Sequence, residues 1–192
     1  MSPQPDELLG ATPTWVSLLR GVNLGKKRQL PMAALRGALA TAGLSEVRTY
    51  LQSGNVIAQS DLRTPEEVSG LLHGVIAAAF SLDVPVMTRS PADLEQVIAQ
   101  NPFTEQAAQR AHLVRVIFLA SPPPTARIER LVSDSSLTGR CQVIGNQVYV
   151  DYVDGYHGTG RTANFFTRVL GVDGTERNWR TVLALSRLAR DE

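Results

Sequence analysis

Three short polar segments carry the residue types that could bind a small anion. The first follows the apolar run Val16–Leu19 and contains Arg20, Asn23, Lys26 and Lys27, the last two being the only lysines of the chain. Guanidinium and ammonium groups bind phosphate and carboxylate oxygens, and glycines in the same loop let backbone N–H groups approach a ligand. This spacing predicts an anion-binding loop directly after a buried strand.

The second and third segments offer amide groups and the start of a helix. The second contains Gln52, Ser53 and Asn55 between two strand-like runs, and the third begins with Asn178 and Arg180. A helix that starts at Asn178 presents free N–H groups and the positive end of its dipole to an anion. We expect the three segments to lie at strand and helix ends and to bind a small anionic or phosphate-bearing ligand.

The same residues have a structural alternative. Asparagine and glutamine in turns commonly bond their own backbone, and Arg20 could pair with a carboxylate instead of a ligand. No spacing among the polar residues identifies a nucleophile or an acid–base pair. The sequence therefore leaves open whether the protein is an enzyme.

A glycine-rich segment supplies a secondary candidate. Residues 155–162 match the phosphate-binding pattern G-x-x-x-x-G-K-[ST], except that Arg161 replaces the lysine. The preceding strand belongs to a predicted antiparallel hairpin, no apolar strand ends in a magnesium ligand, and arginine does not reproduce the compact charge of lysine. We therefore expect a plain anion site at a helix start, formed by Arg161 and Thr162. His157 is the histidine to test as an acid or base.

Composition restricts the other classes of partner. The net charge of +1 argues against a general polyanion binder. Residues 1–60 are nevertheless net basic, so a nucleic-acid-binding or protein-interaction module without catalysis is the alternative function. The predicted strands contain few aromatic residues on which bases could stack, and the RNP pattern is missing.

Further classes receive no support from the sequence. The histidines and the single cysteine, Cys141, lack the spacing of metal ligands, so we expect no metal site and no cofactor. One cysteine, no secretory pattern at the N-terminus and no long apolar run together predict a cytoplasmic protein with no membrane partner. The sequence carries no signal of oligomeric state.

The elements that position these residues predict an α+β fold. The first part alternates as βαββαβ, the ferredoxin-like pattern of a four-stranded antiparallel sheet with two helices on one face. Its predicted strands are 15–19, 47–51, 55–59 and 84–88, and its helices are 31–42 and 65–81. Thr64 with Glu67 forms a capping box, and Pro65 suits the first helical position.

The second part predicts a smaller α+β subdomain packed against the first. Its helices are expected at 91–100, 125–133, 161–170 and 179–189, and its strands at 113–119, 141–144 and 147–152. Residues 104–112 are expected to be a polar connection. The predicted division is a disordered tail at 1–13, a ferredoxin-like subdomain at 14–90 and a second subdomain at 91–192. No sequence repeat is clear enough to identify the two parts as duplicates.

Five segments in a fixed order carry a resemblance to a known family. They are LLRGVNLG (18–25), MAALR (32–36), TYLQSGNVI (49–57), NPF (101–103) and ERNWRTVLAL (176–185). With them the chain resembles the bacterial family catalogued as domain of unknown function 1697, over nearly everything after Thr14. The resemblance implies a compact α+β fold and supplies no activity. Members often have a Ser-Lys pair where this chain has Gly160-Arg161-Thr162, so a role that needs lysine there does not carry over.

Overall fold

The structure, a computed structural model, describes residues 12–25, 28–134, 137, 140–152 and 162–190. Lys26, Lys27, Arg161 and His157 lie outside these residues, as does the expected disordered tail apart from Thr12 and Pro13. What the sequence predicts for them stays a prediction.

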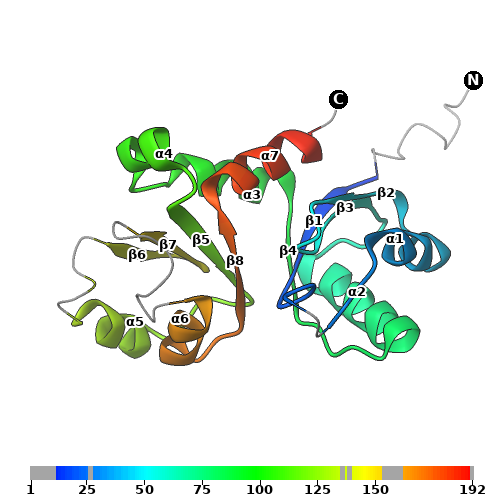
Figure 1. Cartoon of the computed structure of the whole chain (residues 1–192), viewed down its shortest axis with the longest axis horizontal. Coiled ribbons are helices and arrows are strands. Elements are labelled where there is room, and N and C mark those ends of the chain that lie inside the picture. Colours follow the sequence, from blue (N-terminus) through cyan, green and yellow to red (C-terminus); the bar gives the residue numbers. More distant parts are fainter. Residues whose placement is uncertain (1–11, 26–27, 135–136, 138–139, 153–161, 191–192) are drawn as a thin grey trace, which may run out of the picture.

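Two four-stranded antiparallel sheets form the framework (Figure 1). The first has the strand order β2-β3-β1-β4. Its elements are β1 (Thr14–Leu19), α1 (Met32–Thr41), β2 (Ser45–Tyr50), β3 (Asn55–Gln59), α2 (Pro65–Phe80) and β4 (Val86–Arg89). Apolar residues of α1 and α2 pack on the face of the sheet that carries Trp15 and Leu19. Both helices therefore cover the same face.

The second sheet has the order β6-β7-β5-β8. Its elements are β5 (Val114–Leu119), α5 (Thr125–Val132), β6 (Cys141–Ile144), β7 (Gln147–Asp151), α6 (Ala163–Leu170) and β8 (Gly174–Asn178). Helices α5 and α6 pack on the face that carries Ile117 and Leu119. The predicted α+β fold class is confirmed.

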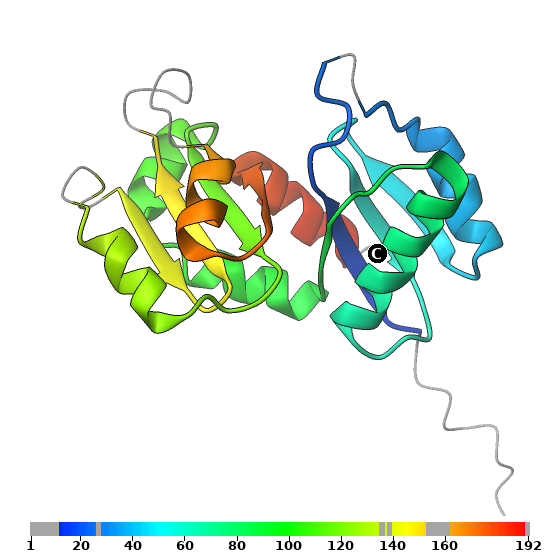
Figure 2. The same cartoon turned by 90° about the horizontal axis from the view of Figure 1, so that it is seen from below.

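One apolar core joins the two sheets. Helices α3 (Pro91–Ala99), α4 (Thr104–Arg110) and α7 (Trp179–Ala189) contribute to it together with the inner faces of both sheets. Figure 2 shows α7 lying between the two halves, where it contacts both sheets and α3. The two halves thus share one core. The predicted division into subdomains 14–90 and 91–192 stays a prediction.

Two elements differ from the sequence prediction. Residues 104–110 form helix α4 and not a polar connection, and its only buried residue is Ala107. Residues 174–178 form strand β8, for which no strand was predicted. Its sequence Gly-Thr-Glu-Arg-Asn has no apolar alternation, and it becomes a strand because it pairs with the apolar strand β5.

The two halves, residues 14–89 and 114–178, repeat one topology. Both run βαββαβ, and both sheets place the strands in the corresponding order. Corresponding backbone hydrogen bonds recur: Leu19 N donates to Gly54 O at 2.8 Å and Leu119 N to Asn146 O at 2.9 Å. The structure therefore shows a repeat that the sequence does not reveal.

The repeat includes two reciprocal arginine contacts between the halves. In the sheet registers Arg89 lies opposite Val16 and Arg177 lies opposite Val116, so the two arginines occupy equivalent positions. Arg89 Nη2 donates to Leu119 O at 2.7 Å, and Arg177 Nη2 donates to Leu19 O at 3.0 Å. Each half thus inserts a buried arginine against the end of the central strand of the other half.

Among the described residues, no helix combines the length and the apolar character needed to cross a bilayer. The cytoplasmic location expected from the sequence stays a prediction.

Candidate functional site

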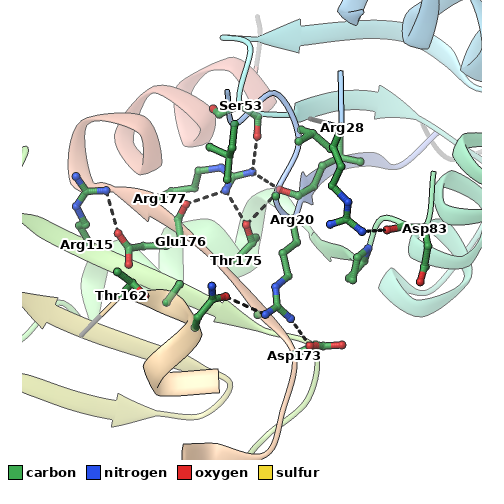
Figure 3. Close-up of a pocket in the computed structure, with 18 residues that line it drawn as sticks. Arg20, Arg28, Ser53, Asp83, Arg115, Thr162, Asp173, Thr175, Glu176 and Arg177 are labelled. Atoms are coloured by element: carbon green, nitrogen blue, oxygen red, sulfur yellow. Dashed lines mark hydrogen bonds and ion pairs between the residues drawn. The ribbon is translucent and has the colours of Figure 1, made fainter. Parts of the chain in front are cut away.

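A cavity of about 740 Å³ lies between the two halves, beside the end of β1 and along the edge strand β8 (Figure 3). Its lining comes from the loop after β1, the turn before β4, strand β5, the start of α6 and strand β8. The cavity contains four arginines and three carboxylates: Arg20, Arg28, Arg115, Arg177, Asp83, Asp173 and Glu176.

Arg20 reaches across the cavity from the first half. It directly follows β1, and its Nη1 donates to Asp173 Oδ1 while its Nη2 donates to Asn164 Oδ1 at 3.1 Å. Both acceptors belong to the second half. The Arg20 side chain is 26% exposed and that of Asp173 61%, so solvent reaches this ion pair.

Arg28 enters the cavity from the loop between β1 and α1. Asn23 fixes this loop, because its side chain donates to Leu30 O and Gln52 O and accepts from Leu30 N. Arg28 donates from Nη2 to the backbone oxygen of Asp83 at 2.7 Å. Among the described residues, no carboxylate pairs with the Arg28 guanidinium, so its charge stays available on an exposed side chain.

Arg115 on β5 and Glu176 on β8 form an ion pair on neighbouring strands. Arg115 Nη1 donates to Glu176 Oε1 at 2.9 Å, and the Tyr152 hydroxyl donates to Oε2 at 3.3 Å. Burial raises the pKa of Glu176, while Arg115 and the hydrogen bonds it receives oppose that shift.

Arg177 is buried and joins the halves. Its Nε donates to Asn55 Oδ1, and its Nη1 donates to Thr175 Oγ1 and Glu176 O. Its Nη2 lies within hydrogen-bonding distance of three backbone oxygens, those of Leu19, Ser53 and Gly54. Burial lowers its pKa to about 10, against the opposing attraction of Glu176. The guanidinium is fully engaged by protein acceptors, which makes it a structural link and not a free ligand group.

Gly54 is required beside this link. Its φ is +76°, and a Cβ there would lie 2.6 Å from Leu19 Cβ and 2.6 Å from Val22 Cγ2. No larger side chain fits without moving β1, so the backbone oxygen of Gly54 depends on glycine to approach Arg177.

The start of α6 also faces the cavity. Its N-cap residue, Thr162, makes no side-chain cap hydrogen bond, as is also the case for α1, α4 and α5, whereas α2, α3 and α7 are capped by a side chain. The first N–H groups of a helix need acceptors, and an anion can supply them. Thr162 and Asn164 line the same cavity as Arg20.

The structure brings together only part of the predicted site. Arg20 and Ser53 of the primary candidate site and Thr162 of the secondary one line the same cavity. The Asn23 side chain donates a hydrogen bond to the backbone oxygen of Gln52, and the Asn55 side chain donates one to the backbone oxygen of Tyr50. The ligand-binding roles of all these residues stay predictions.

The third predicted segment contributes differently than expected. Asn178 accepts a hydrogen bond from Thr181 N as the N-cap of α7. Arg180 is exposed and does not line the cavity. Instead the two residues before Asn178, Glu176 and Arg177, face it. The predicted ligand-binding residues did not include Arg28, Arg115 and Arg177, which also line the cavity. In the sequence, Arg28 stands in the polar loop after the first strand and Arg177 in the segment ERNWR.

Within the described residues, no group of three or more histidine, cysteine and carboxylate side chains is placed to bind a metal ion. Cys141 is partly buried at the start of β6. The residues that line the cavity offer hydrogen-bond donors and charge.

Comparison with known proteins gives a family and a fold. The family model described as "Protein of unknown function (DUF1697)" matches residues 13–149. A solved structure, that of the conserved bacterial protein SP0830 from Streptococcus pneumoniae, is similar at 19% sequence identity and a TM-score of 0.71. The match covers 94% of this chain and 100% of that one. No curated protein matches the chain.

Proposed function

The chain belongs to the DUF1697 family of proteins of unknown function, and we propose that it binds a small anionic ligand, bearing a phosphate or a carboxylate, in the cavity between its two halves. One observation carries the proposal. Arg20 and Arg28, from the loop after β1, and Arg115, from β5, reach one cavity beside a helix start that has no side-chain cap.

Charge and hydrogen bonding support this assignment. Arg28 gives its described hydrogen bond to a backbone oxygen and keeps its charge available. The start of α6 adds N–H donors and the positive end of a helix dipole. Guanidinium groups bind oxyanions with two parallel hydrogen bonds, which suits a phosphate or a carboxylate better than a halide or a neutral ligand.

The covered sheets favour a small ligand over a single-stranded nucleic acid. Modules that bind single strands with a sheet stack the bases on aromatic residues of an open face. Here α1 and α2 cover one face of the first sheet, α5 and α6 cover one face of the second, and the inner faces of both share a core. Neither sheet offers such a platform within the described residues.

Ligand screening by thermal shift tests the proposal. We would compare wild type, Arg20→Ala and Arg180→Ala with a panel of nucleotides and sugar phosphates. A ligand at about 100 times its Kd adds about 2.7 kcal/mol to stability, which is a shift of several degrees. We expect the shift in wild type and in Arg180→Ala, and a loss of at least about tenfold in affinity in Arg20→Ala, because one charge-assisted hydrogen bond contributes about 1.5–3 kcal/mol.

Arg180→Ala is the matched control, since it removes an arginine of the predicted site that lies outside the cavity. Equal shifts in all three proteins, or none in any, would contradict the proposal. Binding of single-stranded RNA that weakens steeply with salt and depends equally on Arg180 would favour the nucleic-acid alternative.

A further inference from the structure

Two side-chain oxygens already accept hydrogen bonds from the Arg20 guanidinium. Asp173 Oδ1 accepts from Nη1 and Asn164 Oδ1 accepts from Nη2. The two acceptors come from different residues of the second half, yet they occupy the two outer nitrogens of one guanidinium. The two oxygens of a single carboxylate or phosphate would make the same pair of contacts.

This ion pair is open to exchange. Both side chains are partly exposed, and exposed ion pairs contribute little net free energy because water competes for each partner. A ligand that makes two charge-assisted hydrogen bonds can therefore displace Asp173.

The fold does not require the pair. Arg20 N donates to Pro85 O at 3.0 Å, and the equivalent bond in the second half joins Ala120 N to Asp173 O at 2.8 Å. The repeat thus places Ala120 where the first half has Arg20, and Pro85 where the second half has Asp173. The equivalent junction forms without either charged side chain. The Arg20–Asp173 ion pair is therefore not needed to form the junction, and its presence calls for a different explanation.

We propose that Asp173 is an internal competitor that occupies Arg20 in the empty protein and is displaced when an oxyanion enters the cavity. The inference rests on the proposed function and narrows its ligand to an oxyanion that presents two oxygens to one guanidinium. Asp173 then sets both the affinity and the selectivity of the site, because only a ligand that out-competes a carboxylate binds.

Titration calorimetry with inorganic phosphate at low ionic strength tests the inference. The proteins are wild type, Asp173→Asn, Arg20→Ala and the double variant Arg20→Ala/Asp173→Asn. We expect Asp173→Asn to bind phosphate about three- to tenfold more tightly than wild type, since it loses a competing ion pair and a repelling charge. In the Arg20→Ala background the same substitution should give a much smaller gain, because the competition acts through Arg20.

Asp83→Asn is the matched control. Asp83 also lines the cavity, and its carboxylate lies 3.9 Å from the His73 ring while only its backbone oxygen contacts an arginine. The Asp83→Asn substitution removes the same charge without freeing a guanidinium. A larger gain in phosphate affinity in Asp173→Asn than in Asp83→Asn therefore measures direct competition. Thermal denaturation of each variant checks that it is folded.

The outcomes separate the two proposals. Equal gains in Asp173→Asn and Asp83→Asn, or a gain that persists undiminished without Arg20, would overturn the competitor role and leave the ligand site standing. Equal binding by wild type and Arg20→Ala would contradict the proposed function itself. An absence of phosphate binding in all variants would count against both.

Discussion

Arg177 shows how one buried side chain can join two halves of a chain. A guanidinium presents five N–H donors in a rigid plane, and here they meet acceptors from β1, β3, β8 and the turn before β3. Lysine has the charge but not the planar fork, so it cannot reach the same set of acceptors. Several buried backbone oxygens would then lose their donor.

Arg177→Lys should therefore lower the free energy of unfolding by at least about 2 kcal/mol, the cost of leaving buried acceptors unsatisfied. Urea denaturation followed by circular dichroism measures the change. Arg180→Lys, at an exposed position three residues along the chain, should stay within about 0.5 kcal/mol of wild type. A value for Arg177→Lys as small as that of its control would show that the guanidinium geometry is not needed.

The raised pKa of Glu176 predicts how the free energy of unfolding depends on pH. Burial raises its pKa in the folded protein above the value near 4.5 of the unfolded chain. Between these two pKa values the folded state binds more protons, so the Glu176 contribution to stability is present below about pH 4.5 and is lost as pH rises. The free energy of unfolding of wild type should fall relative to Glu176→Gln between pH 4 and pH 7, by about 1.4 kcal/mol for each unit of pKa elevation.

Glu67 serves as the control of opposite sign. Hydrogen bonds from the Arg63 backbone and from Thr64 lower its pKa, so its contribution to stability is lost as pH falls. Wild type should gain stability relative to Glu67→Gln over the same rise in pH. Parallel slopes for the two variants would contradict the assignment of a buried, proton-favouring environment to Glu176.

At the scale of elements, the start of helix α6 lies on the cavity and has no side-chain cap. Thr64, Ser90 and Asn178 each accept a hydrogen bond from their own helix, whereas Thr162 does not. The first N–H groups of a helix need acceptors. Under the proposed function, an anion in the cavity is one such acceptor for α6.

Thr162→Asp should accordingly separate stability from binding. A carboxylate at the N-cap should stabilise the protein by about 0.5–1 kcal/mol and, by taking the same N–H groups, weaken phosphate binding. Ser90→Asp adds a charge at a helix start outside the cavity and should leave the phosphate Kd unchanged. Tighter phosphate binding by Thr162→Asp would show that α6 plays no part in the site.

Local signals explain which elements the sequence predicts correctly. Thr64-Pro65 with Glu67, Ser90-Pro91 and Asn178 fix three helix starts through their own side chains, and the structure confirms all three. Strand β8 had no such signal, since its polar residues become a strand only through pairing with β5.

The residues of the site also differ in whether local sequence signals reveal them. Arg20, Ser53 and Thr162 stand in loops or at element ends, where polar residues are visible in a sequence as candidates. Arg115 and Arg177 lie within strands, and the direction of a strand side chain follows from a register that only the folded sheet defines. Arg28 contacts Asp83 at a separation of 55 residues, beyond the range of any local pattern.

At the scale of the whole molecule, the shared core predicts one cooperative unfolding transition. Trp15 lies in the core of the first half and Trp179 in the core between the sheets, and they are the only tryptophans. In Trp15→Phe and Trp179→Phe the remaining tryptophan reports on one region. Its fluorescence in urea should change at the same midpoint as the circular dichroism of the same variant. A fluorescence midpoint displaced from the dichroism midpoint would show that the halves unfold independently.

The reciprocal contacts of Arg89 and Arg177 have a consequence for how such a molecule can vary. A half-length chain that paired with a second copy of itself would form an isologous homodimer. The arginine of each subunit would then donate a hydrogen bond to the other subunit. In that homodimer every substitution would appear twice, at both junctions. In a single fused chain each junction can diverge alone, and here only one of them acquires the Arg20–Asp173 pair while its twin keeps Ala120 and Pro85.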